Sequence, residues 1–158
     1  MFIDSSLEFC DGVTLSGNGI AVKKGDHIDL NATSDLTEHD LGSGEPLYLV
    51  LNVTTAFSGG TSVKIDLRSG DADTLTGGGG TFDIHYTTGT IVAADYGDLT
   101  GRTIIALPKN VFKYRQYLGI FVSTSGAVTG GVADAFLTKD VSNWTSTATR
   151  VPATDPAS

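Results

Sequence analysis

The chain has 158 residues, a formal net charge of −8 and a single cysteine, Cys10. This length is typical of one domain that buries its own core without a metal, and a lone cysteine excludes an intramolecular disulfide. Lys and Arg form no cluster for a nucleic-acid backbone or an anionic membrane, and no segment has the ~20 apolar residues that span a bilayer. We therefore expect no direct nucleic-acid partner and no membrane partner.

The first segment of the chain is unexpectedly apolar for a terminus. Its apolar residues follow no single period, which predicts an extended arm or a first strand at residues 1–9. Glycine-containing turns at 11–12 and 17–19 then separate short strand candidates. These strands are expected at residues 13–15, 20–23 and 27–30.

Two runs with a period of two dominate the middle of the sequence, at residues 47–57 and 61–68. A period of two places alternate side chains on opposite faces of an extended strand. The first run is apolar on both faces and predicts a central strand, whereas the second predicts a strand with one solvated face. Gly59 and Gly60 predict a turn between them. We expect this pair to form the middle of an antiparallel sandwich.

The second half of the chain continues the pattern of short strands and glycine-rich turns. Residues 117–123 are apolar on both faces and predict a central strand, which a turn at Ser125 and Gly126 reverses. Other strands are predicted at residues 82–86, 91–94, 102–107 and 132–137.

About eight short strands without a long helix indicate an all-β fold. The expected architecture is an antiparallel jelly-roll β-sandwich with extended N- and C-terminal arms. We place the single jelly-roll domain at residues 1–138 and a polar C-terminal tail at 139–158.

Two loops contain residues that bind ligands in other proteins. Residues 77–80 are four glycines, but no Lys-Ser or Lys-Thr follows them as a phosphate-binding loop requires. Asp71 with Asp73, and Asp26 with Asp29, lack the ligand spacing of a calcium loop. A flexible loop explains the four glycines better than a phosphate site does, and solvated carboxylates in turns explain the aspartate pairs better than a calcium site does.

The three histidines, His27, His39 and His85, lie far apart in the sequence, and no second cysteine joins Cys10. A zinc site needs three or four converging ligands, usually with a closely spaced pair. No serine lies in a Gly-x-Ser-x-Gly motif. The sequence therefore predicts no catalytic residue, no cofactor and no metal, and a protein that is not an enzyme.

Both ends of the chain carry large apolar residues that a sandwich core does not need. Aromatic residues are frequent anchors of protein–protein contacts. We therefore predict that both ends are interface elements, and that deleting residues 141–158 leaves the fold intact but weakens partner binding. The candidate interface residues are Phe2, Ile3, Leu7, Phe9, Tyr96, Trp144 and Val151.

Several short motifs in order resemble those of a family of tailed-bacteriophage capsid cement, or decoration, proteins. The matching parts are Met1-Phe2-Ile3-Asp4-Ser5 with Leu7-Glu8-Phe9, Gly44-Glu45-Pro46-Leu47, Tyr117-Leu118-Gly119, Thr129-Gly130-Gly131 and Ala135-Phe136-Leu137. The resemblance implies a non-enzymatic jelly roll on the outer surface of the capsid, which stabilises junctions between capsomers of the major capsid protein. It also implies a symmetric homo-oligomer, a homodimer in preference to a homotrimer. Such a protein is made in the host cytoplasm and ends up in the virion.

An alternative from another class is a carbohydrate- or receptor-binding jelly roll of a phage fibre or a cell surface. This function requires an exposed aromatic platform beside polar loops, for which Tyr96, Trp144 and Asp98 are the candidates.

Overall fold

The structure is a computed structural model that describes residues 7–30, 46–71, 82–107, 114–139 and 141. Nearly all regular structure in these residues is β-strand, which confirms the all-β prediction. Residues 1–6 of the expected N-terminal segment 1–9, and residues 140 and 142–158 of the expected tail 139–158, lie outside the described residues. In chain order the elements are β1 (Glu8–Thr14), β2 (Gly17–Asp29), β3 (Tyr48–Gly59), β4 (Ser62–Gly70), β5 (Phe82–Thr87), β6 (Ile91–Val92), the 3-10 helix η2 (Ala93–Leu99), β7 (Gly101–Ala106) and β8 (Tyr117–Thr138).

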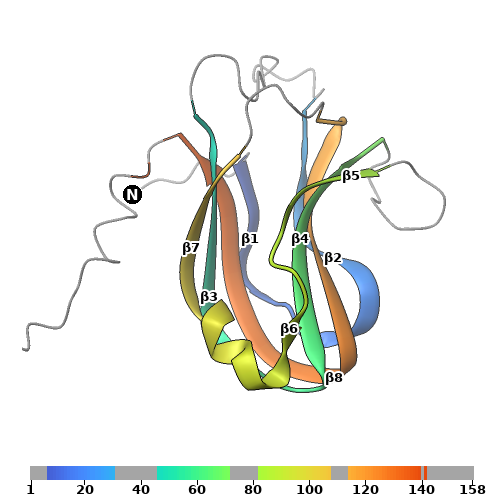
Figure 1. The fold of residues 1–158 in the computed structure, drawn as a ribbon. Helices are drawn as coiled ribbons and strands as arrows, with labels where there is room; N and C mark the ends of the chain where they lie inside the picture. Colours follow the sequence, from blue (N-terminus) through green and yellow to red (C-terminus); the bar gives the residue numbers. More distant parts are fainter. Residues whose placement is uncertain (1–6, 31–45, 72–81, 108–113, 140, 142–158) are drawn as a thin grey trace, which may run out of the picture.

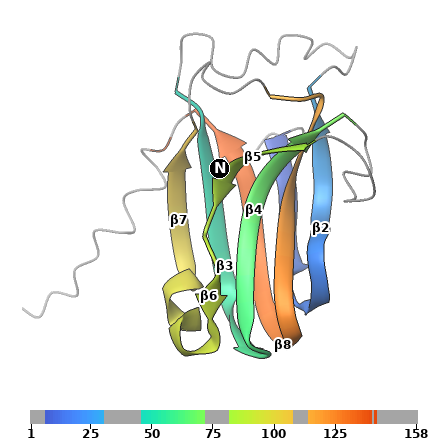
Figure 2. The same cartoon turned by 45° about the vertical axis from the view of Figure 1, so that its right-hand side comes forward.

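The strands form two facing walls that share one strand, β8 (Figures 1 and 2). Wall A has the order β1-β8-β3-β7, in which residues 128–138 of β8 pair with β1 and β3. Wall B has the order β2-β8-β4-β5, in which residues 117–128 of β8 pair with β2 and residues 117–125 pair with β4. Every pairing is antiparallel, and β6 adds to β4. Two walls with these strand orders make a jelly-roll-like β-sandwich, as the sequence predicts.

Four connections cross from one wall to the other at the same end of the sandwich, here named the closed end (Figure 1). They are the turn from β1 to β2, the turn from β3 to β4, the bend of β8, and the segment from β6 through η2 to β7. The opposite end, where β4 ends and β5 begins, is named the open end.

The bend of β8 corrects one prediction. Ser125 and Gly126 do not reverse the chain into a hairpin, because β8 continues for 22 residues through this point. Gly126, Gly130 and Gly131 have φ angles of 77°, 70° and 68°. These left-handed conformations favour glycine and let one strand turn from wall B into wall A.

The expected pairing of the two middle strands is also corrected. β3 and β4 are joined through Gly59 and Gly60, but β8 lies between them in the strand order. The glycine pair therefore connects the two walls instead of closing a hairpin within one sheet.

One hydrophobic core fills the space between the walls. Burying such apolar side chains contributes roughly 1.5–3 kcal/mol each before the entropy of folding is subtracted. Its largest fully buried members include Phe9, Leu15, Leu49, Ile65, Leu67, Leu118 and Ile120.

Candidate functional site

The outward face of β4 carries a buried ion-pair cluster where the sequence predicts a solvated face. Asp66 has a relative exposure of 0%, and Arg68 beside it is also buried. The Arg68 Nη2 donates to Asp66 Oδ2 at 2.6 Å, and its Nε donates to the same oxygen at 3.2 Å. The Lys64 Nζ lies 3.3 Å from this oxygen. Two cations therefore share one carboxylate oxygen.

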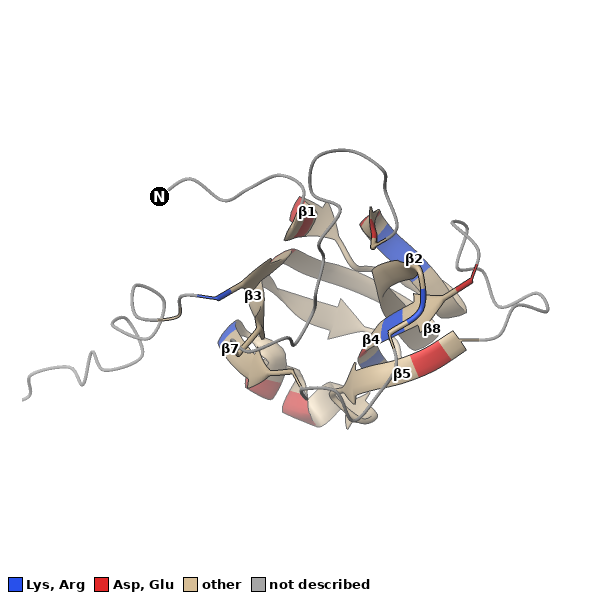
Figure 3. Cartoon of the chain, turned by 90° about the horizontal axis from the view of Figure 1, so that it is seen from above, with Lys and Arg blue, Asp and Glu red and all other residues tan. Residues whose placement is uncertain are grey.

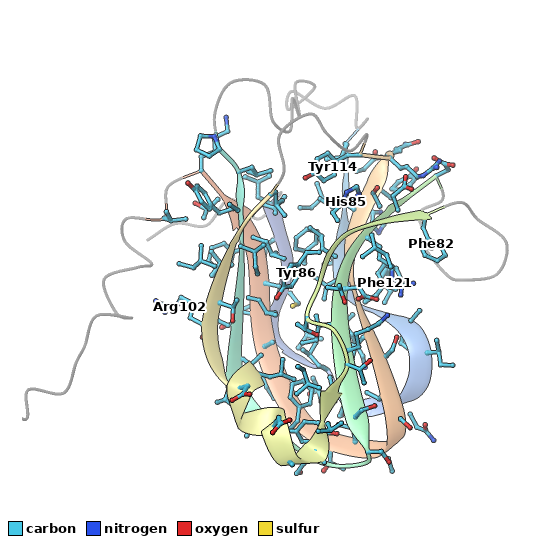
Figure 4. All side chains as sticks on the ribbon, viewed as in Figure 1. Phe82, His85, Tyr86, Arg102, Tyr114 and Phe121 are labelled. Atoms are coloured by element: carbon cyan, nitrogen blue, oxygen red, sulfur yellow. The ribbon has the colours of Figure 1, made fainter. Side chains whose placement is uncertain are left out.

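Two aromatic rings flank the Arg68 guanidinium. Its carbon lies 4.8 Å from the ring centroid of Phe82 and 5.3 Å from that of Phe121. Figure 4 shows Phe82 and Phe121 at the right of the view, beside the strands of wall B. Phe82 and Ile84 of β5 remain 43% exposed, so the cluster is continuous with an apolar surface. Cation–π contacts of this kind add to the ion pair in holding the arginine in place.

The pKa of the Asp66 carboxyl lies below its ordinary value. Burial alone raises this pKa, but hydrogen bonds from Thr87 and Arg68 and the charges of Arg68 and Lys64 lower it by more. The carboxylate is therefore ionised at neutral pH. Its other oxygen, Oδ1, is buried without a hydrogen-bond partner among the described residues.

A second polar cluster lies at the open end, between the walls. Ser69 Oγ and His85 Nε2 are 2.6 Å apart, and the backbone N–H of Arg115 donates to Ser69 Oγ at 3.0 Å. The rings of His85 and Tyr114 lie near one another, with centroids 4.2 Å apart (Figure 4). Burial lowers the pKa of His85, an effect that the charge of Asp83 opposes, and burial raises the pKa of Tyr114. Ser69 is fully buried, so its hydroxyl is not accessible as a nucleophile.

The Arg115 side chain joins the two strands at this end. Its Nη1 donates to Asp71 Oδ2 just beyond β4, and its Nε donates to Asp83 Oδ2 on β5, both at 2.7 Å. These hydrogen bonds and charges raise the pKa of the guanidinium above its ordinary value. Arg115 is thus a clamp between the end of β4 and the start of β5.

The predicted ligand candidates have separate places in the structure. The His27 Nδ1 lies 3.3 Å from the Lys23 Nζ, and its ring packs edge-on against Tyr117. Asp29 accepts a hydrogen bond from Gln116. His39 and Asp73 lie outside the described residues. In the described part of the chain, no three His, Cys, Asp or Glu side chains gather in a group that could hold a metal ion.

Two predicted interface residues belong to this chain's own core. Phe9 is 1% exposed and Tyr96 is 5% exposed, and the Tyr96 hydroxyl donates to the Gly59 carbonyl at 3.2 Å. Leu7 packs partly buried against the same core. Tyr96 therefore offers no exposed ring for a sugar. Phe2, Ile3, Trp144 and Val151 lie outside the described residues, so their interface role stays a prediction.

The exposed apolar residues of the walls were not among the predicted site residues. Phe82 and Ile84 alternate in sequence with Asp83 and His85, which places the two apolar residues on one face of β5. This alternation was the available signal, but a sequence does not show which face of an edge strand looks outward. The view along the strands in Figure 3 shows Lys and Arg on β2 and β4, and Asp and Glu on β1 and β5.

The fold and these surfaces define a jelly-roll-like all-β domain with buried polar clusters and exposed apolar positions on its walls. No helix of the described residues has the length and apolar character to cross a membrane. The model of the Bbp16 family matches residues 15–137, and the chain belongs to this family. No curated protein matches the chain.

Proposed function

We propose that this chain is a structural virion protein, a capsid cement or decoration protein. It binds the outside of a phage head as a symmetric homo-oligomer, a homodimer in preference to a homotrimer. It stabilises the junctions between capsomers of the major capsid protein and turns over no substrate. The Bbp16 family supports a phage-related origin, because its name suggests one.

The observation that carries this proposal is the sharing of β8 by both walls. A single 22-residue strand contributes hydrogen-bond ladders to wall A and to wall B. The two walls therefore act as one stiff body, which is what a protein that bridges two subunits requires. A flexible body would follow the movement of the subunits and would not resist it.

Bridging stabilises a shell through several contacts of ordinary strength. A standard protein–protein interface buries ~800 Å² on each partner. An oligomer that holds two or three such contacts at once raises the effective concentration of each, so modest single-site affinities give long residence. The formal net charge of −8 suits the outer surface of the head better than its DNA-filled interior.

The first test is cosedimentation of the purified protein with empty shells of the major capsid protein from the same virus. We expect saturable binding at a fixed ratio to the shell subunit, and a higher temperature of shell opening when the protein is bound. A protein that stays in the supernatant at all concentrations would refute the proposal. Retention on a glycan array without shell binding would instead support the carbohydrate-binding alternative.

A further inference from the structure

The first part of β2 presents an exposed apolar knob, defined here as Ile20, Ala21 and Val22. Ile20 is 88% exposed, more than any other large hydrophobic side chain in the described residues, and Val22 is exposed as well. In Figure 1 this part of β2 (blue) swings outward from wall B. None of these three residues belongs to the hydrophobic core, so the knob contributes little to the stability of the fold.

A bulge in the strand pairing creates the knob. Gly19 lies opposite Thr124 and Val22 lies opposite Val122, so Ile20 and Ala21 together face a single residue of β8. Ala21 has a φ of 52°, the only positive φ of a non-glycine residue in the described part of the chain. A left-handed backbone costs free energy in any residue with a Cβ, so the surrounding structure must hold it in place.

Two hydroxyl groups of β8 provide this support. Ser123 Oγ accepts a hydrogen bond from the Ala21 N–H at 2.9 Å. Thr124 Oγ1 accepts from the Gly19 N–H at 3.0 Å and lies 3.1 Å from the Gly17 carbonyl, to which it donates. Side chains therefore replace the ladder bonds that the bulge removes. The knob is a fixed shape, and its strain indicates a role outside folding.

The charge around the knob indicates what kind of surface it fits. Lys23 and Lys24 directly follow the knob in a chain whose net charge is −8, and the nearest acidic residues in the sequence are Asp11 and Asp26. An apolar knob beside two cations is complementary to an apolar pocket with an acidic rim. Two copies meeting knob to knob about a twofold axis would bring their lysine pairs together, and this repulsion disfavours a second copy as the occupant.

We infer that the knob inserts into an apolar pocket with an acidic rim on the shell protein, and that Ile20 is its main anchor. This inference rests on the function proposed above and names the part of wall B that contacts the shell. Docking buries an isoleucine that the free protein leaves in water, and the bulge is already formed before binding. Little ordering cost is therefore added at this contact.

The test compares three proteins in cosedimentation with empty shells of the major capsid protein: the wild type, Ile20→Asp and Val92→Asp. Val92 is also an exposed apolar residue, but it lies on β6, which β4 and β8 separate from β2. We expect Ile20→Asp to bind about 10- to 100-fold more weakly, because the burial of one isoleucine side chain is lost. Val92→Asp should bind like the wild type. Unchanged circular dichroism and thermal unfolding would show that both variants fold.

Each other outcome has a distinct meaning. Equal binding by the wild type and Ile20→Asp would overturn the inference and leave the proposed function standing. A wild type that fails to bind the shells would overturn the proposed function, and the inference with it. A change in the oligomeric state of free Ile20→Asp, measured by analytical ultracentrifugation, would show that the knob contacts a second copy and would overturn the assignment to the shell.

Discussion

Asp66 is the residue whose environment differs most from what its type suggests. It is a carboxylate on the outward face of a sheet, yet Arg68 and Lys64 cover it and the rings of Phe82 and Phe121 enclose the arginine. The cations compensate for the lost hydration of the carboxylate. Such a pair contributes little net stability relative to apolar residues, but the loss of one partner leaves a buried charge unpaired.

We expect Asp66→Asn to lower the free energy of unfolding by about 3 kcal/mol at pH 7. Because the folded pKa of Asp66 lies below its ordinary value of 3.8, the contribution of its charge is present above about pH 5 and is lost as the pH falls through the folded pKa. The difference between wild type and variant should therefore shrink in acid. Urea unfolding at several pH values measures both effects.

The matched control is Asp71→Asn, which weakens the exposed ion pair with Arg115 and should have a much smaller effect. Equal losses of unfolding free energy in Asp66→Asn and Asp71→Asn would contradict the view that burial makes the Asp66 ion pair the more important one.

Single residues also show what the sequence could not reveal. The residues around Arg68 alternate as a solvated strand would, and it is the rings of Phe82 and Phe121, from later parts of the chain, that help to bury that face. The apolar character of the first segment predicts Phe9 at an interface and the aromatic ring of Tyr96 predicts the same, but these properties also suit a core. The type of a residue does not distinguish an interface position from a core position, since both environments remove apolar surface from water.

At the scale of elements, the sequence predicts most strands but not their neighbours. Residues 47–57, 61–68 and 82–86 lie almost wholly within β3, β4 and β5. The pairing of β3 with β8 instead joins residues about eighty positions apart, which no local pattern encodes. Gly126 predicts a hairpin, whereas in the structure it lies at a bend of one continuous strand. A hairpin turn and a bend between walls both use glycine with positive φ, so the two look alike in sequence.

The bend of β8 gives a prediction at this scale. Gly131 has a φ of 68°, and a Cβ at this position would overlap the ring of Phe57. Gly131→Ala should therefore lower the free energy of unfolding by about 2–5 kcal/mol through backbone strain and overpacking. Chemical denaturation of the purified variant measures this loss.

Gly97→Ala in η2 serves as the control, because a Cβ there meets no atom within 4 Å. Its stability should stay within about 0.5 kcal/mol of the wild type. A Gly131→Ala protein as stable as this control would show that the bend does not need glycine at 131.

At the scale of the whole molecule, the two ends of the sandwich are held together differently. The connections from β1 to β2 and from β3 to β4 and the bend of β8 are short and join the walls at the closed end, whereas at the open end the Arg115 side chain ties the end of β4 to the start of β5 within wall B. Arg115→Gln should therefore speed amide hydrogen exchange in β5 while leaving β1 unchanged. Hydrogen–deuterium exchange with mass spectrometry resolves these peptides.

Arg102→Gln, on β7 of the opposite wall, tests whether the loss of any arginine has the same result. Faster exchange throughout the molecule in Arg115→Gln would mean that the clamp supports the entire fold and not only its open end.

The continuous backbone of β8 also determines how tension passes through the molecule. A pull that reaches β8 in one wall passes into the other wall along its covalent backbone, so the two walls are not joined by side-chain packing alone. The outermost strands, β1 and β7 in wall A and β2 and β5 in wall B, each pair with a single neighbour, so separation would begin at these strands. Under such a pull β8, which pairs with strands of both walls, would be the last strand to separate.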